Sequence, residues 1–157
     1  MTIRSNVQRQ IESAFASSDR PEPSQYITSR DVEAVEDSSE FVGRDWAGLS
    51  NDLLAANYNV LFWFTPKAFH YYLPAFLIAA LKANDKDALY VHAILQILRE
   101  LVGKDFCRER LALLSAEQLE SIDGWLAWLM LDQTSEALFS LEVNDARNSI
   151  RKHRARL

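Results

Sequence analysis

Three neighbouring polar side chains beside a proline form the best candidate for a small-molecule site. His70, Tyr71 and Tyr72 closely precede Pro74 inside a long apolar stretch. A proline within a helix leaves the carbonyl four residues earlier, here that of His70, without its usual donor. A polar group beside a broken hydrogen bond in an aromatic core could shape a ligand pocket. The alternative is that these side chains satisfy one another, with the tyrosine hydroxyls reaching the helix surface.

Other residues with reactive side chains lack the spacing of a catalytic or metal centre. The histidines His70, His92 and His153 are far apart in the sequence, and none follows a glutamate by three residues as in di-iron bundles. The single cysteine, Cys107, lies between a lysine and an arginine, which can lower a thiol pKa, but no histidine is near it in the sequence. We therefore expect no metal and no cofactor, and the sequence favours a protein that is not an enzyme.

The acidic side chains suggest a surface for a protein partner. The chain has a net charge of −5, but residues 147–157 hold five basic side chains and no acidic one, so the remainder has a net charge of −10. An acidic body disfavours binding to nucleic acid or to an anionic membrane. A solvated acidic face is the plain alternative to a partner-binding one. The candidate partner-binding residues are Asp31, Glu33, Glu36, Asp37, Glu40 and Asp45.

The basic end of the chain, residues 147–157, could have a function of its own. Arg147, Arg151 and Arg154 follow the spacing i, i+4, i+7 and form a stripe on a predicted helix. Cations are favoured near a helix C-terminus, so a structural reason suffices for them. The functional alternative is contact with an acidic partner or with nucleic acid. The tail could equally lie on the protein's own acidic region at residues 31–45.

A helix over about residues 65–82 must position these candidates. Thr65 and Pro66 are typical of a helix start, and the residues that follow are apolar nearly all round. The apolar run is shorter than the roughly 18 residues that span a bilayer, so we expect a central core helix. Pro74 costs about 3 kcal/mol there, but burying half a dozen large side chains at roughly 1.5–3 kcal/mol each outweighs it. The sequence predicts a kinked helix that is not broken.

The rest of the chain predicts an all-α fold of six or seven helices in one domain, residues 1–157. Residues 58–64 are predicted to form a short helical turn, although their composition would also allow an extended segment. Residues 104–110 are predicted to be a charged connector, and Gly124 could allow a close helix crossing. Four other helices are predicted over residues 2–16, 28–37, 46–57 and 85–103, the second with a capping box at Thr28 and the fourth running from Asp85 to Gly103. A Ser115–Gln118 capping box is predicted to open a further helix, and the last helix is predicted to start at Thr134 and Ser135.

Composition bounds the class of protein. Hydrophobic residues make up 48% of the 157 residues, with eight Phe, five Tyr and four Trp, which argues against disorder. One cysteine excludes an internal disulfide framework and suits a reducing compartment. The N-terminal stretch lacks the apolar core of a signal peptide. We expect a cytoplasmic protein.

Several blocks resemble an uncharacterised family of small, mainly bacterial, helical proteins known by a domain-of-unknown-function label. The block Tyr72-Leu73-Pro74-Ala75 is the most specific, and Phe64-Thr65-Pro66-x-Ala68 and Leu114-Ser115-x-x-Gln118 are further matches. Phe76 stands where a second tyrosine is usual. The resemblance implies a helical domain and nothing about activity, and it supplies no catalytic residues.

The leading hypothesis is a non-enzymatic, cytoplasmic interaction module that presents an acidic face to a partner protein. One version is an immunity-like inhibitor whose acidic groups occlude a basic toxin site. Two alternatives remain open. The first is a small-molecule binder or enzyme with its pocket at the Pro74 kink, and the second is nucleic-acid contact through the basic tail.

Overall fold

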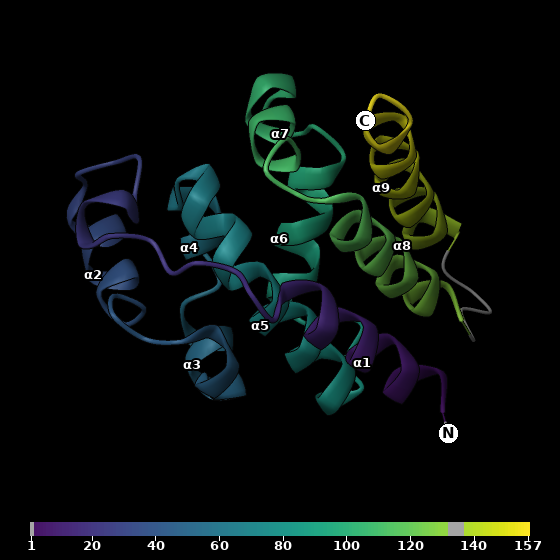
Figure 1. The fold of residues 1–157 in the computed structure, drawn as a ribbon, viewed down its shortest axis with the longest axis horizontal. Helices are drawn as coiled ribbons and strands as arrows, with labels where there is room; N and C mark the ends of the chain where they lie inside the picture. Colours follow the sequence, from purple (N-terminus) through teal and green to yellow (C-terminus); the bar gives the residue numbers. More distant parts are fainter. Residues whose placement is uncertain (1, 132–136) are drawn as a thin grey trace.

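The structure is a computed structural model that describes residues 2–131 and 137–157. These residues form nine α-helices and two short 3-10 helices, joined by turns and loops (Figure 1). The predicted all-α class is confirmed, and the predicted number of helices was too low. The predicted start of the last helix at Thr134 and Ser135 lies outside the described residues. In chain order the elements are α1 (Ile3–Phe15), η1 (Pro23–Gln25), α2 (Val32–Ser39), η2 (Trp46–Gly48), α3 (Asn51–Ala56), α4 (Val60–Trp63), α5 (Pro66–Ala83), α6 (Leu89–Leu98), α7 (Lys104–Leu111), α8 (Ala116–Met130) and α9 (Ala137–Ala155).

The predicted central helix is α5, which contacts α1, α3, α6, α7 and η2. It begins as expected, with the Thr65 hydroxyl accepting a hydrogen bond from the Ala68 amide at 3.1 Å. It continues through Pro74 without a break, and thirteen of its 18 residues are buried, which is the burial that offsets the proline. It ends at Asn84, whose φ of 51° is left-handed. No helix in the described ranges is both long and apolar enough to cross a membrane.

The chain between α6 and α8 differs from the prediction. Helix α6 ends at Leu98 and not at Gly103, because Glu100 adopts a left-handed φ of 65° and the Leu101 amide closes the turn on the Gln96 carbonyl at 3.0 Å. Asp85 does not cap α6. Its carboxylate accepts from the Asp87 amide at 3.0 Å in the preceding turn. Residues 104–110 are not a connector but belong to α7.

A buried arginine explains why α7 was missed. Arg110 is only 2% exposed, so the core side of this short helix carries a basic residue and the expected apolar periodicity is hidden. The guanidinium donates to the Phe64 carbonyl at 2.6 Å and to the Phe106 carbonyl at 3.1 Å. Burial lowers its pKa to about 10. Arg110 therefore ties α7 to the segment that leads into α5.

Helix α8 lies between α1 and α9. The predicted capping box opens it, with the Gln118 amide donating to the Ser115 hydroxyl at 3.1 Å and the Ser115 amide donating to the Gln118 side chain at 3.0 Å. The predicted close crossing at Gly124 is with α1, since a Cβ atom there would lie 3.1 Å from Oε1 of Gln10. The Trp125 indole donates to the Leu77 carbonyl at 3.0 Å and joins α8 to α5.

Within residues 58–64 only Val60–Trp63 are helical, as α4, so the predicted helical turn is present but shorter than expected, and the chain becomes extended at Phe64. Phe64 forms an isolated antiparallel bridge with Ile27. Thr28 does not begin a capping box: its hydroxyl and its amide both donate to the Trp63 carbonyl, at 3.2 and 2.8 Å, and α2 starts after Asp31. The predicted helix 46–57 is divided into η2 and α3, because Ser50 caps α3 through the Leu53 amide at 3.2 Å.

Candidate functional site

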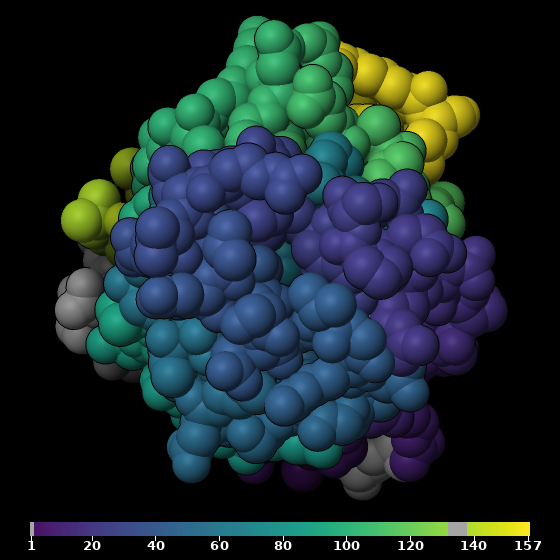
Figure 2. Space-filling view, turned by 90° about the vertical axis from the view of Figure 1, so that its left-hand side faces the viewer, coloured from purple at the N-terminus to yellow at the C-terminus, as the bar shows by residue number. Residues whose placement is uncertain are grey.

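The predicted partner-binding carboxylates lie on α2 and on the loop that follows it. We call this set the acidic edge: Asp31, Glu33, Glu36, Asp37, Glu40 and Asp45. All are exposed except Asp37, which is half-buried. Figure 2 faces this end of the molecule, where blue atoms of the segment that contains the acidic edge cover much of the view.

Five of these carboxylates make no ion pair with any cation in the part of the chain that the structure describes. Within the described residues, only Asp45 of the acidic edge takes part in an ion pair. Some carboxylates elsewhere are used internally, as when Asp123 and Glu120 of α8 pair with arginines of α9. The charge of the acidic edge is therefore directed at solvent or at another molecule.

Apolar side chains stand among these charges. Val32 is 73% exposed, Val35 44% and Val42 41%. Protein interfaces combine apolar contacts with polar groups around them. These three valines therefore add apolar surface to the acidic edge.

Three of the charges along α2 also lack a structural reason. Asp31 and Glu33 lie at the helix N-terminus, where negative charge is favoured. Glu36 and Asp37 lie in its second half and Glu40 at its C-cap, where the helix dipole disfavours negative charge. The helix keeps these three at a cost in stability.

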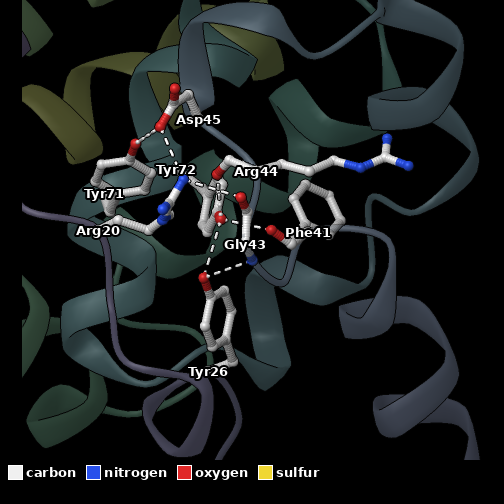
Figure 3. Close-up of polar contacts among 8 residues, drawn as sticks. All are labelled: Arg20, Tyr26, Phe41, Gly43, Arg44, Asp45, Tyr71 and Tyr72. Carbon is white, nitrogen blue, oxygen red and sulfur yellow. Dashed lines mark hydrogen bonds and ion pairs between the residues drawn. The ribbon is translucent and has the colours of Figure 1, made fainter.

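Buried tyrosines fasten the loop of the acidic edge to α5 (Figure 3). The Tyr72 hydroxyl lies 2.6 Å from the Phe41 carbonyl, 2.7 Å from the Arg44 carbonyl and 3.4 Å from the Tyr26 hydroxyl. The Gly43 amide donates to the Tyr26 hydroxyl at 3.1 Å. Each hydroxyl has one hydrogen, so Tyr72 donates to a carbonyl and Tyr26 must donate to Tyr72. Burial raises the pKa of Tyr72, which keeps this hydrogen in place.

A second set of contacts holds Asp45. The Tyr71 hydroxyl donates to Oδ1 of Asp45 at 3.2 Å, and Nη1 of Arg20 lies 3.0 Å from the same oxygen. Arg20 also donates to the Gly43 carbonyl at 2.9 Å. Burial and the neighbouring Asp45 carboxylate both raise the pKa of Tyr71. Gly43 has a φ of 79°, a conformation that favours glycine.

The predicted pocket residues therefore separate. Tyr71 and Tyr72 pack edge to face at 4.8 Å and serve the loop, whereas Nε2 of His70 lies 2.9 Å from Oε1 of Gln118 on α8. Pro74 is buried in α5. The structure brings the two tyrosines to the acidic edge, a link between two predicted sets that the sequence does not show.

A groove does lie beside α5, one turn beyond these residues. Its volume is about 360 Å³. Sequence reasoning missed it because most of its α5 wall is alanine, which carries no chemical signal. The lining residues are Glu12, Trp46, Ala47, Leu49, Asn51, Ala75, Ile78, Ala79, Lys82 and Ala83.

The predicted basic stripe lies on α9 and faces α8. Arg147 and Arg151 pair with Asp123 at 2.9 and 3.9 Å, and Arg154 pairs with Glu120 at 3.6 Å. The alternative that the tail lies on residues 31–45 is therefore wrong. Two carboxylates therefore offset most of the charge of these three arginines.

Cys107 is buried, and it is not an activated thiol. Burial raises its pKa to about 11, and the Glu100 carboxylate adds to this, against the opposing effect of Arg110. In the parts of the chain that the structure describes, no group of three or more His, Cys, Asp or Glu side chains could hold a metal ion.

Fold and surface together define an all-α domain with an acidic edge fastened to a central, proline-containing helix. The chain belongs to a family of unknown function, DUF6714, which matches residues 3–147. The resemblance drawn from the sequence is thereby confirmed. No curated protein matches the chain, and no solved structure does. The matched range includes the whole acidic edge, whereas Arg151 and Arg154 lie beyond it.

Proposed function

We propose that this protein is a non-enzymatic binding module whose acidic edge docks onto a basic surface of a partner protein. One observation carries the proposal: five carboxylates that pair with no described cation surround exposed valines on one short helix and its flanks. Carboxylates facing a basic patch would speed association and select the partner, and the valines would supply the dry contacts.

The fastening of the loop supports this role. Binding is weakened when loops must be ordered on association, so a surface ordered in advance binds more tightly. The hydroxyls of Tyr26 and Tyr72 hold the backbone at Phe41, Gly43 and Arg44 before any partner arrives.

A narrower version is an immunity-like inhibitor, in which the carboxylates cover a basic functional site on a toxin. In either version we place the protein in the cytoplasm, because its one cysteine is a free thiol and a reducing compartment suits it.

Affinity capture from extracts of the native host tests the proposal. The edge variant carries Glu33→Gln and Glu36→Gln, and the control carries Asp52→Asn and Glu117→Gln, which neutralise two exposed carboxylates elsewhere. We expect a basic protein that the wild type and the control retain and that the edge variant loses. Equal recovery of the same proteins by all three forms would rule the acidic edge out.

The groove beside α5 favours a second candidate function, the binding of a small apolar molecule. Trp46, Leu49 and Ile78 supply apolar walls, and the exposed Glu12 and Lys82 add charges of opposite sign. Titration with an apolar fluorescent dye tests it. Stoichiometric binding should be lost in Ala79→Phe, which fills the groove, and kept in Ala55→Phe, which lies at an exposed position of α3. Equal binding by both variants would exclude the groove.

A further inference from the structure

A second pocket lies between α7 and α9, away from the acidic edge, and its walls are strongly basic. Its volume is about 160 Å³, the space of about five water molecules. The lining residues are Glu100, Lys104, Cys107, Arg108, Leu111, Ser149, Lys152, His153 and Arg156. Cys107 and Leu111 are buried, whereas the four cationic side chains are exposed.

Most of this positive charge is not neutralised. Among the described residues, no carboxylate lies within ion-pair distance of Lys104, Lys152 or Arg156. Arg108 is paired with Asp105, and Glu100 is the one acidic side chain in the lining. Three unpaired cations and one carboxylate thus line a small recess.

The lining also contains a polar atom that lacks a partner. Nε2 of His153 is buried and makes no hydrogen bond to any described residue. A buried polar group normally has a partner, so an unsatisfied one beside a pocket suggests a ligand that completes it.

The basic residues of α9, together with Arg156 just after its end, lie on two sides. Arg147, Arg151 and Arg154 pair with carboxylates of α8, whereas Lys152 and Arg156 line the pocket facing α7. The unpaired cations are therefore not the ones that the stripe pattern singles out.

We propose that this pocket binds a small phosphate-bearing ligand, with the phosphate group held by Lys104, Lys152 and Arg156. Arginine binds phosphate oxygens with two parallel hydrogen bonds and lysine adds a compact charge, so both suit a phosphate group. The recess has room for one phosphate and a few attached atoms. An extended nucleic acid backbone would instead need a row of unpaired cations, and the row on α9 is paired.

Calorimetric titration with inorganic phosphate at constant ionic strength tests the site. The pocket variant carries Lys152→Ala and Arg156→Ala. The control carries Arg151→Ala and Arg154→Ala, which remove the same charge from the same end of the chain, on the side facing α8. We expect the control to bind within about twofold of the wild type and the pocket variant at least about tenfold more weakly. No saturable binding by the wild type, or equal losses in both variants, would overturn the proposal.

Two further measurements sharpen the result. Glu100→Gln removes the one carboxylate of the lining, so it should tighten phosphate binding several-fold, and unchanged affinity would place the anion elsewhere. The second measurement is a titration with a single-stranded oligonucleotide. Oligonucleotide binding that Arg151→Ala with Arg154→Ala abolishes, and that the pocket variant keeps, would show that the stripe is the anion site.

Discussion

The Tyr72 hydroxyl is the one polar atom of α5 that reaches two carbonyls of the loop carrying the acidic edge, those of Phe41 and Arg44. Removing it leaves buried acceptors unsatisfied, which costs about 1–3 kcal/mol. We therefore expect Tyr72→Phe to lower the free energy of unfolding by that amount in urea denaturation. Tyr71→Phe is the matched control, because its partner Asp45 is exposed, and it should cost less than about 1 kcal/mol. Similar losses in the two variants would contradict the fastening.

Cys107 makes stability depend on alkaline pH. Its pKa in the folded protein is raised to about 11 from an ordinary value of 9.0, so the folded state holds its proton longer than the unfolded state. This stabilising contribution is complete below pH 9 and is lost as the pH rises through 11, on the order of 2 kcal/mol. Between pH 8 and 11, the wild type should lose more unfolding free energy than Cys107→Ala does. Parallel losses would mean that the thiol ionises as readily in the folded protein.

At the scale of the element, acidic residues near the C-terminus of α2 are expected to lower the stability of that helix. Glu40 lies at the C-cap, where the dipole disfavours it, and no described cation pairs with it. Glu40→Lys should therefore raise the free energy of unfolding by about 0.3–1 kcal/mol. Glu33→Lys, the same change at the helix N-terminus, should lower it by a similar amount. If chemical denaturation shows the same sign for both, the helix dipole does not account for the placement of these residues.

Elements with a continuous apolar pattern were predictable, and those that depend on a distant partner were not. The Thr65 cap, the run through Pro74 and the Ser115–Gln118 box are local signals, and each predicted its helix. Helix α7 was not predicted because its buried face carries Arg110. The Arg110 guanidinium can be buried since it donates hydrogen bonds to the carbonyls of Phe64 and Phe106, and Phe64 is remote in sequence.

In the candidate site, the carboxylate cluster was predictable from the sequence and its contacts with other elements were not. Clustering of carboxylates in residues 31–45 is visible in the sequence, and their exposure follows from the short amphipathic α2. That Tyr71 and Tyr72 reach this loop depends on how the loop folds back on α5, which no spacing shows. The same holds for the pairing of the basic stripe with Asp123 and Glu120.

Two clusters of unpaired charge with opposite sign lie apart on the molecule. Helices α2 and α9 lie at opposite ends of its long axis (Figure 1). The acidic edge on α2 has unpaired carboxylates, and the pocket between α7 and α9 has unpaired cations. A partner attracted to one end would be repelled by the other, so the overall field would orient a basic partner before contact.

Hydrogen exchange of the protein alone and in complex with the partner recovered by affinity capture tests the central claim. We predict slower exchange in the complex for amides of residues 31–45, with α9 unchanged, because docking on the acidic edge excludes water from α2 and from the fastened loop. Protection confined to the groove beside α5 or to α7 and α9, with residues 31–45 exchanging as in the free protein, would contradict it.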